Sequence, residues 1–251
     1  MTICYFSASG NSLYVARRVG GKLLSIPKLV QQGTIEIEDD AVGIVSPVYL
    51  GGLPLMVQDF LERVSVKTDY LFFLFTCGNG GSFDQVMEIG RSRGLDFQYC
   101  NIIRMVDNFL PGFEMQEQID TLPQKNVEGQ LDVVCADIAA RKEQRPQLSP
   151  PGMAPMVLFR KRLVKKILRR DAAHSYIVDA NCILCGVCAK VCPANNITIA
   201  DGKVSFADCC EVCYACVHNC PKGAIHVPGE KSSARFRNEN VTLQDMIEAN
   251  S

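Results

Sequence analysis

Eight of the chain's thirteen cysteines repeat one spacing in the last third of the sequence. Each run has three cysteines separated by two residues and, four residues later, a fourth cysteine that precedes a proline. The runs are Cys182, Cys185, Cys188 and Cys192, and then Cys210, Cys213, Cys216 and Cys220. Thiolates two residues apart can converge on three corners of one iron–sulfur cube, whereas the cysteine before proline is directed toward the other cube. The spacing therefore predicts two clusters whose ligands cross over, and a chain that moves electrons.

This pattern resembles that of bacterial ferredoxins with two [4Fe-4S] clusters. The resemblance implies that Cys182, Cys185, Cys188 and Cys220 hold one cluster, and that Cys210, Cys213, Cys216 and Cys192 hold the other. The chain around the cysteines repeats with an offset of 28 residues, so that Cys192-Pro193 matches Cys220-Pro221. Apolar residues between the ligands are expected to keep water from the clusters, and a domain this small is expected to need its metal to fold.

Zinc is the alternative, because repeated Cys-x2-Cys pairs also build zinc sites. Zinc sites generally use separated pairs, and two triplets that each lead to Cys-Pro fit cubane ligation better. Cys209 is surplus, since counting from it breaks the repeat, and we expect it to be a spectator thiol. The remaining four cysteines lie in apolar or helical surroundings, where cysteine usually behaves as a small buried hydrophobe.

Three loops of small residues follow strand-like runs in the first 140 residues. In a doubly wound sheet, ligands bind outside the carboxyl ends of the strands, at the topological switch point. The first loop could wrap a phosphate with backbone N–H groups, and without a lysine it is no Walker motif. Its residues are Ser7, Ala8, Ser9, Gly10, Asn11 and Ser12.

The first loop resembles the phosphate-binding loop of flavodoxins, which holds the phosphate of FMN. The resemblance implies that the two later loops flank the isoalloxazine ring. The residues concerned are Pro47, Val48, Tyr49, Leu50 and Gly51, and Thr76, Cys77, Gly78, Asn79 and Gly80. Each loop alone is also explained by plain turn chemistry, but three at these places, beside the ferredoxin repeat, favour FMN.

The aromatic residues depart from the flavodoxin pattern. Many flavodoxins stack the flavin between tryptophan and tyrosine, and this chain has no tryptophan. Tyr49 is the one aromatic residue within the flanking loops, and it is either a partly exposed loop residue or a stacking partner that keeps water from the ring. Phe83 and Phe109 are candidates for the opposite face and are equally consistent with the core.

The elements that position these loops alternate between strand and helix. Apolar runs at 2–6, 41–45 and 70–75 predict buried parallel strands, and helical patterns lie at 13–24, 54–64 and 83–93. A later strand at 97–106 and a helix at 127–143 complete a predicted three-layer α/β sandwich. We therefore expect a flavodoxin-like, doubly wound, five-stranded parallel sheet, followed by a small α+β ferredoxin-like domain.

Prolines from Pro146 to Pro155 predict the domain boundary. We expect an FMN-binding domain over 1–145, a linker with a basic amphipathic helix over 146–174, the ferredoxin domain over 175–230 and a tail over 231–251. The basic helix, with its apolar stripe from Met156 to Ile167, would suit an anionic membrane or an acidic partner, but packing as an ordinary linker is favoured. Thr242 and Asp245 form a capping-box signal for one last helix.

The combined chain resembles flavodoxin–ferredoxin fusion proteins of anaerobes, the EFR-type ferredoxins. The resemblance implies intramolecular electron transfer between FMN and two cubanes, and exchange with redox partner proteins. Two alternatives stay open: an FMN-dependent reductase of a small substrate supplied by the clusters, and a cluster-only ferredoxin that has lost flavin. No G-x-G-x-x-G unit follows a strand, so a dedicated NAD-binding fold is not evident.

Composition and charge are consistent with this prediction. The net charge is −1, with acidic residues in excess over 1–140 and basic residues in excess afterwards, so the two halves are able to dock on one another. The N-terminus lacks the pattern of a signal peptide, and no apolar run approaches the roughly 20 residues of a membrane span. We expect a cytoplasmic protein with redox partner proteins, without a transmembrane segment and without a nucleic-acid partner.

Overall fold

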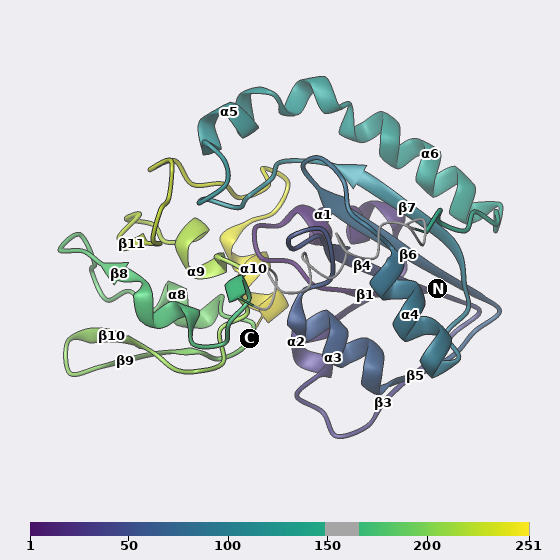
Figure 1. Ribbon diagram of the computed structural model, residues 1–251, viewed down its shortest axis with the longest axis horizontal. Helices are drawn as coiled ribbons and strands as arrows, with labels where there is room; N and C mark the ends of the chain where they lie inside the picture. Colours follow the sequence, from purple (N-terminus) through teal and green to yellow (C-terminus); the bar gives the residue numbers. More distant parts are fainter. Residues whose placement is uncertain (149–165, 251) are drawn as a thin grey trace.

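The computed structural model describes residues 1–148 and 166–250 (Figure 1). Its larger part is built on a five-stranded sheet in the order β2-β1-β4-β6-β7, in which all neighbouring strands are parallel. The strands are β1 (Thr2–Tyr5), β2 (Lys22–Ser25), β4 (Ala41–Pro47), β6 (Tyr70–Cys77) and β7 (Phe97–Arg104). The predicted flavodoxin-like fold is thereby confirmed, with its switch point between β1 and β4.

Helices cover both faces of this sheet. On one side α1 (Asn11–Val19) packs beside α6 (Val127–Ala139), and on the other α3 (Leu55–Arg63) packs beside α4 (Asp84–Arg93) (Figure 1). Shorter elements connect them: α2 (Ile26–Leu29), α5 (Met115–Asp120) and η1 (Leu122–Lys125). Each crossover returns to a parallel strand, so the carboxyl ends of all five strands open at one edge.

Strand β6, which lies between β4 and β7 in the sheet, has an apolar sequence because it is buried along its whole length. All eight of its residues are buried, because helices cover both faces of the strand. The ring of Phe73 lies 4.8 Å from that of Phe75 and 5.7 Å from that of Phe97. This aromatic core holds the strands whose ends carry the candidate loops.

The predicted helix over 13–24 is wrong in its second half. Helix α1 ends at Val19, and Gly20 and Gly21 follow with φ of +86° and +95°. A Cβ at Gly21 would lie 2.5 Å from the carbonyl oxygen of Met1, so only glycine allows this turn. The chain then enters β2, the one strand of the five-stranded sheet for which the sequence analysis gave no range. A second, two-stranded parallel sheet of β3 (Ile35–Glu38) and β5 (Val64–Lys67) is also absent from the prediction.

The cysteine-bearing part consists of very short elements and two antiparallel pairs, β8 with β11 and β9 with β10. They are η3 (Ala172–Ser175), β8 (Ile177–Val178), α8 (Val187–Lys190), β9 (Ile197–Ala200), β10 (Lys203–Phe206), α9 (Ala215–His218) and β11 (Ile225–His226). The 28-residue repeat recurs in the backbone, since positive φ at Leu184, Gly186 and Asn195 returns at Val212, Tyr214 and Gly223. The two runs therefore share one local fold.

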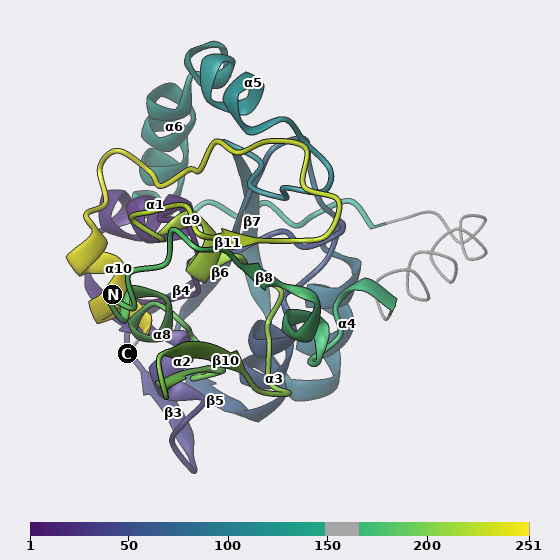
Figure 2. The same cartoon turned by 90° about the vertical axis from the view of Figure 1, so that its left-hand side faces the viewer.

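The tail returns to the flavodoxin-like part and ends in α10 (Leu243–Asn250) (Figure 2). The capping box forms as predicted, with Asp245 N–H donating to Thr242 Oγ1 and Thr242 N–H donating to Asp245 Oδ2. Most of the predicted basic helix, residues 156–165, lies outside the described residues. Within the part of the chain that the structure describes, no helix is both long and apolar enough to cross a membrane.

Candidate cofactor-binding sites

The three predicted loops meet at the carboxyl ends of β1, β4 and β6. They line two adjoining cavities, a larger one of about 330 Å³ and a small one beside the first loop. The larger is lined by Val48, Tyr49, Leu50, Gly51, Cys77, Asn79 and Gly80, and the smaller by Ser7, Ala8, Ser9, Asn11, Ser12, Pro47, Thr76 and Gly78. Of the sixteen predicted residues, only Gly10 lines neither cavity.

The first loop has the features of an anion site. The hydroxyl of Ser7 is buried and has no hydrogen-bond partner among the described residues. Gly10 has φ of +94° and precedes α1, whose first N–H groups lack partners within the helix. A buried donor beside a helix N-terminus fits the phosphate of FMN.

The carbonyl groups of this loop are held from the far side of the chain. The Ser9 carbonyl accepts from Asn238 N–H at 2.8 Å, and the Ala8 carbonyl accepts from Asn219 Nδ2 at 3.2 Å. Gly10 lies against the tail, where an added Cβ would come within 3.0 Å of the side chains of Asn238 and Val241. The predicted phosphate loop is therefore covered by the cysteine-bearing part and the tail.

The second loop is a tight turn from Tyr49 to Gly52. Tyr49 N–H donates to the Gly52 carbonyl at 2.9 Å, and Gly52 N–H donates back at 3.0 Å. Both central residues have positive φ, +50° at Leu50 and +81° at Gly51, as in a type I′ turn. Leucine is strained in this conformation, and strained residues often lie at ligand sites. The Gly51 carbonyl accepts from Ser82 N–H, which ties the second loop to the third.

Of the three aromatic residues considered as flavin contacts, two line the larger cavity and one lies in the core. Tyr49 lines the larger cavity and is buried, so the first of its two alternatives, a partly exposed loop residue, is wrong. Phe83 packs in the core, 4.8 Å from Phe75 between ring centres. Phe109 lines the cavity and is the better placed of the two phenylalanines to cover a flavin.

In the loop after β7, sequence reasoning named Phe109 as a candidate but missed Asp107 and Asn108. Asp107, Asn108 and Phe109 line the larger cavity, and Asn108 Nδ2 donates to Ser9 Oγ at 2.8 Å. Burial raises the pKa of Asp107, although its carboxylate accepts from Phe109 N–H. The rule that ligands bind at the carboxyl ends of strands could have found this loop, because it follows the strand next to β6.

Besides Gly112 and Phe113, the larger cavity has a wall from outside the flavodoxin-like part. Val212, Cys213 and Tyr214 line it together with Leu168. The ring of Tyr214 lies 6.0 Å from that of Phe109, so the aromatic groups of the two parts meet at the cavity. A predicted cluster ligand, Cys213, thus borders the predicted flavin site.

The structure brings the eight cysteines together in two sets. Cys182, Cys185, Cys188 and Cys220 line one small cavity and form the outer set. The pKa of the Cys188 thiol is raised to about 11, first by burial and then by the three other thiols of the outer set. The inner set is Cys210, Cys213, Cys216 and Cys192, and the pKa of Cys213 is raised by burial and then by Cys192, Cys210 and Cys216. These are the sets that the ferredoxin resemblance implies.

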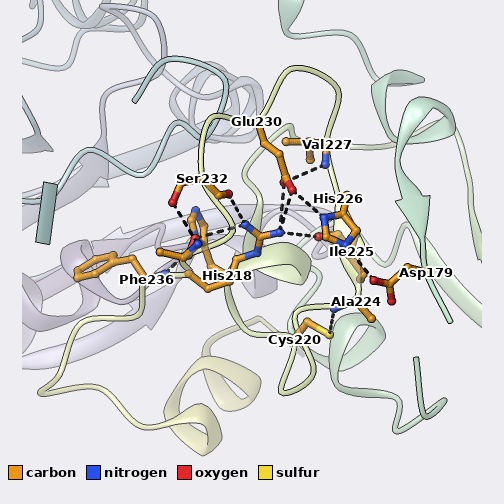
Figure 3. A network of polar contacts seen from close by, with 12 residues as sticks. Asp179, His218, Cys220, Ala224, Ile225, His226, Val227, Glu230, Ser232 and Phe236 are labelled. Atoms are coloured by element: carbon orange, nitrogen blue, oxygen red, sulfur yellow. Dashed lines mark hydrogen bonds and ion pairs between the residues drawn. The ribbon is translucent and has the colours of Figure 1, made fainter. Parts of the chain in front are cut away.

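Backbone N–H groups point at sulfur in both sets. Asn196 N–H donates to Cys192 Sγ and Val212 N–H to Cys210 Sγ, each at 3.2 Å, and Ala224 N–H donates to Cys220 Sγ at 3.4 Å (Figure 3). Such bonds stabilise thiolates and raise the potential of clusters bound to them. Within the described residues, no group of three histidine, cysteine, aspartate or glutamate side chains is arranged to hold a single metal ion.

The sets differ in their surroundings. All four inner cysteines are buried, whereas Cys185 of the outer set is exposed. Next to the inner set, the buried carboxylate of Glu211 accepts from Met56 N–H at the start of α3 and pairs with Arg170 at 2.5 Å. Burial raises the pKa of Glu211, and the charge of Arg170 opposes that shift. The inner set is therefore anchored to the flavodoxin-like part by the hydrogen bond from Met56 N–H to the buried Glu211 carboxylate, which the half-exposed Arg170 also holds.

Two histidines that carry no sequence prediction have structural partners. His218 Nε2–H donates to the Asn108 carbonyl at 2.9 Å and Nδ1 accepts from Phe236 N–H, which defines a neutral tautomer between the two parts. His226 lies between Glu230 and Asp179, at 2.7 and 3.2 Å (Figure 3). These carboxylates raise the pKa of His226, Glu230 more than Asp179.

Comparison with known proteins gives one clear finding. Residues 175–198, which hold the first cysteine run, match a family described as a 4Fe-4S binding domain. No curated protein matches the chain. Among solved structures, a candidate flavoprotein from Bacteroides eggerthii matches with 18% identity and a TM-score of 0.33, over 53% of this chain and 96% of its own. The chain thus contains a segment similar to 4Fe-4S binding domains, beside the flavodoxin-like fold that its strand order shows.

Proposed function

We propose that this chain is an electron-transfer protein that binds FMN and two [4Fe-4S] clusters and exchanges electrons with redox partner proteins. When bound, FMN exchanges electrons singly or in pairs, and each cubane accepts one electron at a time. The observation that carries the proposal is the shared wall, since Cys213 of the inner set lines the cavity at the flavin loops.

Different residues of the chain would then have different roles in binding the cofactors and transferring electrons. Ser7 and the N–H groups of the first loop bind the phosphate, while Tyr49, Phe109 and Tyr214 exclude water from the ring. The inner set, buried and next to this cavity, would receive electrons first, and the outer set, with Cys185 exposed, would face the partner. We also propose the two ligand sets named above and domain limits at residues 145, 174 and 230. The chain would then be a member of the EFR-type fusion family.

The test is a cofactor count on anaerobically reconstituted protein. We expect about eight iron, eight sulfide and one FMN per chain, and loss of about half the iron in Cys213→Ser. Reduction of the flavin should lead to reduced clusters in wild type within the same molecule, at a rate independent of protein concentration. Zinc in place of iron, or a rate that rises with concentration, would contradict the proposal, and clusters without extractable FMN would indicate a cluster-only ferredoxin.

A reductase of a small substrate is the second candidate, and Asp107 is the observation that favours it. The carboxyl group lines both cavities and has a raised pKa because it is buried. A buried carboxyl with a raised pKa is a common proton donor. If Asp107→Asn abolishes reduction of a small acceptor while electron transfer to a protein acceptor persists, the enzyme interpretation replaces the carrier.

A further inference from the structure

Three asparagines from the last 33 residues hold the carbonyl groups of the predicted phosphate loop. Asn250 Nδ2 donates to the Ser7 carbonyl at 3.4 Å, Asn219 Nδ2 to that of Ala8 at 3.2 Å, and Asn238 N–H to that of Ser9 at 2.8 Å. All three are at most 5% exposed. Three successive carbonyl groups are thus fixed from outside the flavodoxin-like part.

Peptide geometry turns this arrangement into an anion site. In a trans peptide the carbonyl and the following N–H point in opposite directions. With the carbonyls of Ser7, Ala8 and Ser9 held by the asparagines, the N–H groups of the next three residues point away from them. Ala8 and Ser9, which carry two of these N–H groups, line the small cavity together with Ser7, whose hydroxyl has no hydrogen-bond partner among the described residues. The asparagines therefore orient the backbone N–H donors of the loop, although they supply none of these donors themselves.

Two of the asparagines, Asn219 and Asn250, are themselves held by hydrogen bonds to the cysteine-bearing part. Asn219 lies between Cys216 of the inner set and Cys220 of the outer set, and its Nδ2 also donates to the Ala215 carbonyl. Asn250 Nδ2 also donates to the carbonyl of Val191, the residue before Cys192. The positions of these two donors consequently depend on the fold of the segment that carries the clusters.

We infer that the cysteine-bearing part and the tail complete the FMN phosphate site, so that flavin affinity depends on assembly of the clusters. The inference rests on the proposed function and adds a coupling to it. Because coupling is reciprocal, bound FMN should also raise the affinity of the chain for its clusters. Cluster assembly would then precede tight flavin binding, and a chain without clusters would hold its flavin loosely.

The test compares FMN with riboflavin, which lacks the phosphate, by flavin fluorescence quenching on the cluster-loaded full chain. Asn219→Ala and Asn250→Ala should each raise the Kd of FMN roughly tenfold, the effect of one lost hydrogen bond in a buried site. The Kd of riboflavin should stay unchanged. Asn240→Ala, at an exposed asparagine of the same tail, is the matched control and should alter neither.

The iron and sulfide content of each variant is measured on the same sample, so that a folding defect is recognised. If Asn219→Ala loses iron, Asn250→Ala at the end of the chain carries the test. Equal FMN affinity in wild type and variants, or a parallel loss of riboflavin affinity, would overturn the inference and leave the proposed function standing. Failure of the wild type to bind FMN would instead overturn the flavin assignment itself, and the inference with it.

Discussion

The two cysteine runs share one backbone and differ in what surrounds it. We define the inner loop as residues 210–216 and the outer loop as residues 182–188, which are related by the 28-residue repeat. Glu211 and Val212 of the inner loop are buried, whereas the equivalent Ile183 and Leu184 are 58% and 41% exposed. One local fold thus occurs in two environments, and contact with the flavodoxin-like part accounts for the difference.

The largest expected effect comes from removal of iron. On the proposed ligation, both loops would lose the metal that closes them, and structural metal sites contribute several kcal/mol, comparable to the stability of a small domain. The outer loop should then exchange its amide hydrogens at unfolded rates. The inner loop should keep partial protection, because Glu211, Val212 and Tyr214 remain packed on the flavodoxin-like part.

Hydrogen exchange with mass spectrometry on anaerobically chelated protein measures this difference. Strands β4 and β6 are the internal reference, because neither carries any of the eight proposed ligand cysteines, and both should stay protected. Equal loss of protection in both loops would show that seating on the flavodoxin-like part contributes nothing to the inner loop.

The next largest expected effect is a difference in stability between substitutions at positions 211 and 183, which are equivalent in the repeat. Glu211→Ala removes a buried carboxylate, leaves Met56 N–H and Arg170 without their partner, and should lower the free energy of unfolding by about 3 kcal/mol. Ile183→Ala, at the same place in the repeat but exposed, should change it by less than about 0.5 kcal/mol. Urea unfolding of the cluster-loaded protein measures both, and similar losses would contradict the comparison.

Glycine at the positive-φ positions should act with opposite sign in the two loops. Leu184 and Val212 have φ of +55° and +52°. Leu184→Gly relieves backbone strain at an exposed site and should stabilise the protein by about 0.5 kcal/mol, because the relief slightly exceeds the entropy cost of glycine. Val212→Gly relieves the same strain but loses a buried side chain, for a net loss of about 1 kcal/mol. The same unfolding assay checks both, and equal signs would show that backbone strain outweighs burial here.

Much of the fold and site could be predicted because the signals are local. Continuous apolar runs marked the buried strands, and the carboxyl-end rule located the three loops. Strand β2 was missed because its apolar residues continue the helical period of α1, and only Gly20-Gly21 marks the break. The asparagines at 219 and 250 had no local signal, since their loop partners lie 211 and 243 residues away. Contacts of that kind depend on tertiary packing, which short-range patterns do not report.

The smallest expected effect is a pH dependence confined to the outer side. His226 lies on β11, next to Ile225, which lines the cavity of the outer set, and the residue at the equivalent place in the repeat is Thr198. Since Glu230 and Asp179 raise its pKa, the imidazolium pair stabilises the fold fully below the unfolded pKa of about 6.5, and this contribution disappears as pH rises through the folded value. The site is partly exposed, so the effect should be at most about 1 kcal/mol.

His226→Gln should remove this pH dependence, whereas Thr198→Val, the matched substitution at the equivalent place in the repeat, should keep it. Unfolding of both variants and the wild type at pH 5.5 and 8.5 measures the difference. Arg235 also pairs with Glu230, so part of the network keeps its charge after His226 is replaced, and the variant should still fold at both values. A wild-type stability that rises between these pH values would show that His226 is not the group that titrates, and that the outer side lacks the charge-dependent anchor inferred from its carboxylates.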